Sequence, residues 1–273
     1  SYYLGNNTSS QNSLKKNHKY LCKIYPLLIE IKSDGSLIKK FQDENIKFIE
    51  KFKVKSNITP LVQTFQMDSV ISNEVILNKQ IWKSLFNNLI QFIKQNHFNS
   101  LNIDIEGIKK KNKDKFNEFI YQFSKIMSRA GYTLGLSIPA KTEDNHSSWS
   151  GAYDYKELGE IADELIIMAY DYHWALGTPG PIAPLPWVQD VIDYAILNIS
   201  VEKVYLGIPC YGYDWNIDSD KRARGLSYNQ VMNILKKNDS NWEWDQESES
   251  PYFKYREKEK NHEVWFENKN SIL

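Results

Sequence analysis

The feature that most constrains the fold is the alternation of short apolar segments with amphipathic segments along the whole chain. Apolar side chains recur every three or four positions in several segments, which predicts helices over residues 76–95, 113–130, 155–161, 186–197 and 227–236. Short apolar runs lie between them. The run over residues 164–170 is almost entirely apolar, as expected for a strand buried on both faces. This order predicts an α/β fold built on a parallel sheet.

We expect seven main strands, at residues 2–5, 21–31, 58–65, 101–106, 133–139, 164–170 and 204–209. An open doubly wound sheet and a closed (β/α)8 barrel both fit this order. The barrel is favoured because polar residues gather where strands end: Asp104 and Glu106, Tyr170 and Asp171, and residues 211–215. No glycine-rich phosphate loop follows the first strand, which counts against a dinucleotide-binding fold. A short strand over residues 264–266 and the start of a helix at residue 270 close the sequence.

Composition excludes several functional classes. The 273 residues include 34 basic and 34 acidic side chains, and this balance counts against a general nucleic-acid or membrane-surface binder. No run approaches the roughly 18 apolar residues of a membrane span, and no signal peptide is visible. Cys22 and Cys210 are far apart, so we expect two buried free thiols rather than a bridge. No histidine or cysteine spacing indicates a metal, and no cofactor is expected.

The segment 102–106 carries the clearest chemical signal. On a strand, alternate residues face the same way, so Asn102, Asp104 and Glu106 share one face. Two carboxylates in a confined space do not both ionise cheaply, and the one that keeps its proton has the raised pKa that a general acid requires. An exposed edge strand with an ordinary polar face explains the spacing equally well.

Longer runs of sequence carry a resemblance to a known family. Residues 98–106, FNSLNIDIE, resemble the fourth-strand motif D-x-x-D-x-D-x-E of glycoside hydrolase family 18. The run Met168-Ala169-Tyr170-Asp171 is similar to the sixth-strand motif M-x-Y-D of that family. Residues 168–215 resemble its spore cortex-lytic branch, and shorter matches at residues 33–37, 251–253 and 264–267 extend the resemblance over nearly the whole chain.

The resemblance implies a barrel glycosidase that cleaves β-1,4 bonds next to N-acetylglucosamine in spore cortex peptidoglycan. Such enzymes retain configuration without a protein nucleophile, because the 2-acetamido carbonyl of the sugar attacks its own anomeric carbon. Carried over to this sequence, Glu106 is the general acid/base, and Asp104 orients the acetamido group and stabilises its positive charge. Tyr170 would hydrogen-bond the acetamido oxygen, and Asp171 would contact the sugar or support this pocket.

The sequence departs from the family pattern in two places. Asn99 and Asn102 occupy the first two acidic positions of the fourth-strand motif, and we expect Asn102 to hold Asp104 by hydrogen bonding without sharing a proton. The sequence also ends at Leu273, before the eighth strand of the family plan. We therefore expect a single catalytic barrel over residues 1–273 that lacks its eighth strand here and belongs to a longer protein.

Loop residues after the strand ends complete the candidate sugar site. They are Trp149, Trp174, Trp215, Tyr213 and Asp214. Aromatic faces stack on sugar rings, although ordinary loop packing explains each of the three tryptophans equally well.

The expected partner is a GlcNAc-containing polysaccharide, bound by a monomer in the bacterial spore or outside the cell. Two alternatives stay open. One is a chitinase or an endo-β-N-acetylglucosaminidase that acts on another GlcNAc polymer. The other is a catalytically inactive carbohydrate-binding barrel, against which Glu106 argues, because inactive relatives usually lose that residue.

Overall fold

The computed structural model describes residues 1–3, 5, 8–40, 43–52, 57–144, 149–219 and 221–272. Within them the chain divides into two compact units. The first comprises residues 1–139, 144–166 and 198–205, and the second comprises residues 140–143, 167–197 and 206–273. Leu4, which lies within the first predicted strand, and Leu273, the last residue of the sequence, lie outside the described residues. No helix of the described part has both the length and the apolar character needed to cross a membrane.

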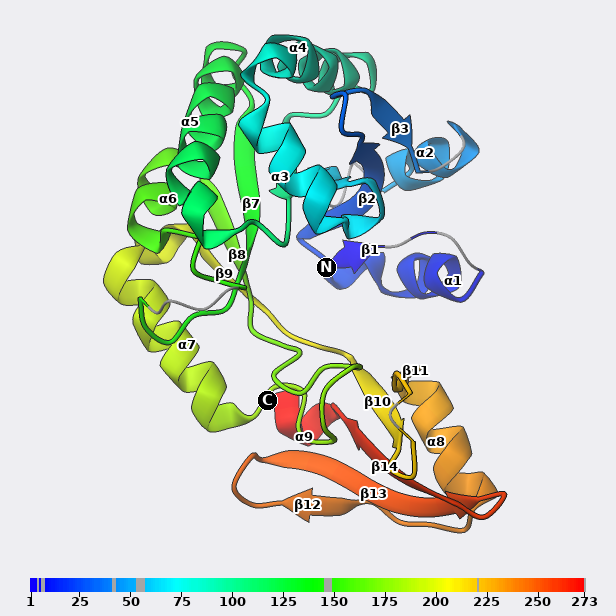
Figure 1. Ribbon diagram of the computed structural model, residues 1–273. Coiled ribbons are helices and arrows are strands. Elements are labelled where there is room, and N and C mark those ends of the chain that lie inside the picture. The colour runs from blue at the N-terminus through cyan, green and yellow to red at the C-terminus, as the bar shows by residue number, and fades with distance from the viewer. Residues whose placement is uncertain are drawn as a thin grey trace. The chain divides into compact units, whose positions relative to one another are not determined.

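A curled parallel sheet forms the centre of the fold (Figure 1). The path of hydrogen-bonded strands runs through β1 (Tyr2–Tyr3), β2 (Lys23–Ile31), β5 (Leu61–Thr64), β6 (Ser100–Asp104), β7 (Thr133–Pro139), β8 (Glu164–Met168) and β9 (Val204–Gly207). These are the seven strands that the sequence predicts, in the predicted order. The α/β class is confirmed, and the sheet is a half-barrel consistent with a (β/α)8 fold.

Short additions extend the first strands of this sheet. Residues 32–36 turn the chain back from β2 into β3 (Leu37–Lys39), which pairs with β2 in antiparallel fashion. The strand β4 (Asn57–Ile58) pairs with β2 in parallel. The remaining elements here are α1 (Thr8–Asn17), η1 (His18–Tyr20) and α2 (Asp43–Glu50).

The helices that complete the first unit are α3 (Ser69–Leu77), α4 (Lys79–Gln95), α5 (Lys113–Arg129) and α6 (Tyr155–Ile161), with the short turns η2 (Phe65–Met67), η3 (Lys110–Asn112) and η4 (Val201–Lys203). The helices α4 and α5 bury the faces that their sequence periodicity predicts, and α3 was not predicted. The helix α5 packs against α4, α6 and β7. Its Phe123 stacks on Phe86 of α4 with ring centroids 5.0 Å apart. One predicted helix is divided, because the side chain of Asn78 accepts from the Gln80 amide and starts a new helix there.

The second unit contains a sheet that the sequence reading did not anticipate. It has five antiparallel strands in the order β11 (Arg224–Ser227), β10 (Tyr211–Asn216), β14 (Lys260–Phe266), β13 (Ser250–Glu257) and β12 (Glu243–Asp245). The helix α8 (Tyr228–Lys237) packs on this sheet, with Val231 and Leu235 against Phe253 and Phe266. The unit also holds α7 (Leu185–Asn198) and α9 (Lys269–Ile272). The helices α7 and α8, the start of α9 and the strand at residues 264–266 were predicted from the sequence, whereas β10, β11, β12 and β13 were not.

Cys22 and Cys210 are both free, as predicted. Both are exposed, so the expectation that they are buried is wrong.

Candidate active site

The strand β6 places the predicted carboxylates in the interior of the sheet. Asn102 and Asp104 are 0% and 5% exposed, while Ile103 and Ile105 are buried on the opposite face of the strand. Glu106, two residues beyond Asp104, is half-buried. Because β6 pairs with β5 on one side and β7 on the other, the alternative of an exposed edge strand is wrong.

Asp104 is a buried carboxyl that accepts a hydrogen bond from one side chain of the described part of the chain. Gln63, its register partner on β5, donates from Nε2 to Oδ2 of Asp104 at 2.7 Å. Oδ1 of Asp104 has no hydrogen-bond partner among the described residues. Burial raises the pKa of Asp104 to about 6, and the hydrogen bond from Gln63 opposes that rise. Asp104 can therefore exchange a proton near neutral pH.

Gln63, which donates to Asp104, was not predicted as a site residue from the sequence. The available signal was a lone amide near the end of the apolar strand Leu61–Thr64, next to the strand that carries the carboxylates.

Asn102 does not donate to Asp104, contrary to expectation. Its Oδ1 accepts from the hydroxyl of Ser137 at 2.8 Å, and the hydroxyl of Tyr2 lies 2.8 Å from the same Ser137 oxygen. Since the Ser137 proton is committed to Asn102, Tyr2 is the donor to Ser137. Nδ2 of Asn102 has no partner in the described part of the chain. It faces Gly135 on β7, where a Cβ would lie 2.9 Å from it.

A buried tyrosine fixes the point where the chain leaves β6. The hydroxyl of Tyr153 donates to the carbonyl oxygen of Ile105 at 2.8 Å. Tyr153 is fully buried, which is the main reason why its pKa lies well above the ordinary value, and the charges of Glu106 and Asp104 add to the effect. The phenol therefore stays protonated and keeps its hydrogen bond to the backbone beside Glu106.

A second cluster lies in the second unit, after β8. The backbone of Asp171 is left-handed, with φ of 61°. Its Oδ1 accepts from the hydroxyls of Tyr211 and Tyr213, the latter at 3.1 Å. Burial and the Asp171 charge raise the pKa of Tyr213 to about 12, so this phenol remains a donor. The ring of Tyr170 packs edge-on to Tyr211, with centroids 6.4 Å apart. The structure thus brings Tyr170, Asp171 and Tyr213 together and adds Tyr211, which the sequence reading left out of the site.

Asp214 lies on the opposite face of β10 and has no free oxygen. Its Oδ2 accepts from Arg224 at 2.7 Å and from the Tyr255 hydroxyl at 2.9 Å. Its Oδ1 lies 2.8 Å from Nδ1 of His262. With 4% of its surface exposed, Asp214 joins strands of the antiparallel sheet.

The three candidate tryptophans differ in their surroundings. Trp215 is 4% exposed, packs with Ala175 and Trp265, and donates from Nε1 to the Gly177 carbonyl at 3.1 Å. Trp174 and Trp149 expose about half of their surface, 53% and 54%. Of the three tryptophans, these two are accessible to solvent and Trp215 is not.

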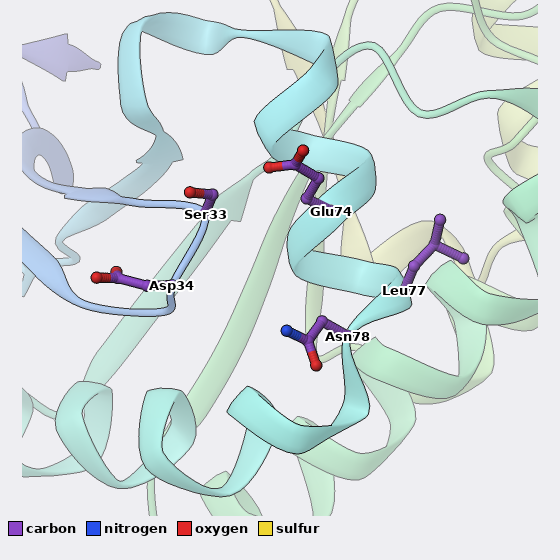
Figure 2. A pocket seen from close by; sticks show the side chains of 5 residues that line it. All are labelled: Ser33, Asp34, Glu74, Leu77 and Asn78. Atoms are coloured by element: carbon purple, nitrogen blue, oxygen red, sulfur yellow. The ribbon is translucent and has the colours of Figure 1, made fainter.

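A separate pocket of about 540 Å³ lies beside α3 in the first unit. Figure 2 shows the residues that line it, which are Ser33, Asp34, Glu74, Leu77 and Asn78. Asp34 accepts from the Ser36 amide at 2.8 Å, and this bonding lowers its pKa. The polar groups of Asp34 and Asn78 serve the turn and the start of α4. In the described residues no group of three or more His, Cys, Asp or Glu side chains could hold a metal ion.

Comparisons with known proteins show the family and the fold. The family model for glycosyl hydrolases family 18 matches residues 32–273. An uncharacterized glycosylase of Bacillus subtilis, YvbX, is 29% identical over 99% of this chain and 80% of its own length. The cortical fragment-lytic enzyme of the same organism is 29% identical over 72% of this chain and 47% of its own, so the chain spans about half of that relative. A chitinase from Chromobacterium violaceum has the same fold, with a TM-score of 0.90 over 100% of this chain and 86% of its own, at 24% identity.

Proposed function

The chain belongs to glycoside hydrolase family 18, and from this premise we propose that it is a retaining glycosidase that cuts β-1,4 bonds next to N-acetylglucosamine. One observation supports the chemistry most directly. Among the described residues, Asp104 is a buried carboxyl with one unpartnered oxygen and a raised pKa, and it ends β6 two residues before the half-buried Glu106. Buried polar atoms are nearly always hydrogen-bonded, so the unpartnered oxygen supports a role for Asp104 beyond structure.

The reaction that we propose runs in two steps. In the first, Glu106 donates its proton to the glycosidic oxygen while the acetamido carbonyl oxygen bonds to the anomeric carbon and the glycosidic bond breaks. A rotation of the Asp104 side chain would turn its unpartnered oxygen to the acetamido N–H and stabilise the positive charge that develops there. In the second step, a water oxygen bonds to the anomeric carbon, and the bond between that carbon and the acetamido oxygen breaks, which opens the oxazolinium ring. A proton of the water passes to Glu106.

We assign the second cluster to the acetamido group and the sugar. Tyr170 would donate to the acetamido oxygen. Asp171 would contact the sugar, and the hydroxyls of Tyr211 and Tyr213 hold the Asp171 carboxylate in place. Left-handed backbone at a non-glycine residue costs free energy and is found at functional sites, which supports a role for Asp171.

The exposed Trp174 and Trp149 are the proposed aromatic walls of the sugar site. The predicted sugar contacts of Asp214 and Trp215 find no support in their saturated, buried positions.

We propose spore cortex peptidoglycan as the polymer, with a monomer acting in the spore or outside the cell. The relationship to a cortical fragment-lytic enzyme supports this choice. The likeness to a chitinase supports the alternative, a GlcNAc polymer such as chitin.

The test incubates the parent and Glu106→Gln with purified cortex and, separately, with chitin, then identifies the sugar at each new reducing end by mass spectrometry. We expect the parent to release cortex fragments that end in N-acetylglucosamine. Glu106→Gln should bind the polymer and release nothing. Release from chitin alone would favour the alternative. A parent that releases nothing from either polymer would contradict the enzymatic proposal.

A further inference from the structure

Glu106 lies in the loop that leaves β6, residues 105–112, and this loop is fastened on both sides of Glu106. On one side, Tyr153 binds the carbonyl of Ile105 at 2.8 Å. On the other, the loop lies against α3, and the contact is made by Asn73, which is 6% exposed. The catalytic role proposed above does not use Asn73.

The amide of Asn73 uses its full hydrogen-bonding capacity. Its Nδ2 donates to the Ser69 carbonyl at 2.6 Å and to the Gly107 carbonyl at 3.0 Å. Its Oδ1 accepts from the Lys109 amide at 3.0 Å and from Nδ2 of Asn112 at 2.7 Å. Three of these four bonds reach the loop, and one of them ends on the residue that directly follows Glu106.

A second observation shows how closely the loop approaches the helix. Gly107 has φ of +70°, and a Cβ there would lie 2.6 Å from the Cβ of Ser69. A side chain at this position would push the loop away from α3. The close approach and the hydrogen bonds of Asn73 are therefore two parts of one contact.

The position of Asn73 in α3 is costly for the helix itself. Asparagine disfavours a helix interior, because its amide competes for backbone groups and its side chain loses rotamer freedom. Here one bond of the amide returns to Ser69 of its own helix, and the other three are made with the loop. The local cost is offset by bonds that order residues 107–112.

We infer that Asn73 is a positioning residue for Glu106, an inference that rests on the proposed function. A general acid must lie within hydrogen-bond reach of the oxygen that it protonates. Asn73 fixes the backbone on the C-terminal side of Glu106 and Tyr153 fixes it on the N-terminal side. Asn73 acts through the loop, so it supports the chemical step rather than the binding of the polymer.

The test measures kcat and KM on soluble chito-oligosaccharides or cortex fragments, whichever the parent cleaves, for Asn73→Ala and for Asn112→Ala. Misplacement of a catalytic group by about 1 Å costs on the order of 100-fold. We expect kcat to fall about 10- to 100-fold in Asn73→Ala and less in Asn112→Ala, with KM within about twofold of the parent. The matched control is Val75→Ala, which removes buried apolar atoms from the same helix. It should lower the melting temperature without lowering kcat.

Gly107→Ala supplies a coupling test. If Gly107 and Asn73 act through one contact, the double variant should lose little more kcat than the worse single variant. If the fold losses in kcat of the two single variants multiply in the double variant, the two residues act separately, and the inference that they form one contact is wrong. Should Asn73→Ala fail to fold, the decision passes to Asn112→Ala, which leaves α3 unaltered.

Amide hydrogen exchange tests the contact between Asn73 and the loop without any assay of activity. The Lys109 amide should exchange slowly in the parent and fast in Asn73→Ala, with no change in Val75→Ala. Fast exchange of the Lys109 amide in the parent would overturn the inference. An unchanged kcat in Asn73→Ala and Asn112→Ala, measured with an active parent, would overturn it as well. An inactive parent would instead overturn the proposed function, and the catalytic part of the inference with it.

Discussion

Two buried aspartates, one in each unit, are almost equally shielded from solvent and differ in every contact. Asp104 is 5% exposed and has one donor, Gln63, for its two oxygens. Asp214 is 4% exposed and has Arg224 and Tyr255 on one oxygen and His262 on the other. Burial alone therefore does not tell which carboxylate does chemistry. In Asp104 the unpartnered oxygen supports the proposed chemical role, because buried polar atoms are nearly always hydrogen-bonded.

The most direct way to break this comparison is to make the same substitution at both positions. Asp104→Asn should lower kcat by about 10³-fold, because it removes the negative charge that faces the developing positive charge. Asp214→Asn should leave kcat within about twofold of the parent, since its partners are structural. Steady-state kinetics on the cleaved polymer checks both. Equal losses of kcat in Asp104→Asn and Asp214→Asn would contradict the proposal that only Asp104 takes part in the chemistry.

The pH dependence of stability sharpens the comparison. The folded pKa of Asp104 lies near 6, above the ordinary value of 3.8, so the folded state holds this proton more tightly than the unfolded state. The associated stability is complete below about pH 4 and is lost as the pH rises through 6. The loss amounts to about 3 kcal/mol for this carboxyl.

Urea denaturation of the parent and Asp104→Asn at pH 4 and pH 7 checks this prediction. The variant should be more stable than the parent at pH 7, and the gap should close at pH 4. Glu267, whose pKa burial raises to about 7, contributes in the same sense to both proteins and cancels in the difference. A gap that does not change with pH would contradict the account.

The stability of the Asp214 variant should change in the opposite direction at pH 7. Asp214→Asn leaves Arg224, Tyr255 and His262 with one neutral acceptor in place of a carboxylate. We expect a loss of about 2 kcal/mol in the free energy of unfolding. Because Arg224 is well exposed, water replaces part of what it loses. Denaturation at pH 7 measures the loss, and an unchanged stability would show that these bonds contribute little.

The smallest expected effect concerns the one donor to Asp104. Gln63→Leu removes the hydrogen bond that favours the ionised form, so the pKa of Asp104 should rise. The acidic limb of the pH–rate profile should then move upward by about one pH unit. Gln122→Leu, on the exposed face of α5, is the matched control and should not move that limb. If the acidic limb of the pH–rate profile does not move in Gln63→Leu, that limb reflects the pKa of a group other than Asp104.

The parallel sheet and the carboxylates of β6 were predictable from the sequence, because period-two and period-3.6 patterns are local. Gln63 was not, because its importance comes from the register of β5 against β6, which places it opposite Asp104. Asn102 could be placed on the right face, but its partner Ser137 lies on another strand. Which donor serves which acceptor is decided by pairing between strands.

The antiparallel sheet was missed for a different reason. Phe253 and Tyr255 alternate with Lys254 and Arg256 along β13, which is a strand pattern. The turn after it gives no usual signal, since the left-handed residues are Lys258 and Glu259 rather than asparagine and glycine. The sequence around it is rich in charge and lacks the turn residues that mark a hairpin.

The packing of Asn102 against Gly135 has a consequence for how such a sequence can diverge. The Cβ of any residue other than glycine at position 135 would lie 2.9 Å from the amide nitrogen of Asn102, which is too close unless one of them shifts. Neither position can gain volume while the other stays as it is. The two residues, 33 positions apart in the chain, should therefore be replaced together, so that a homologue with a larger residue at one of them carries a compensating change at the other.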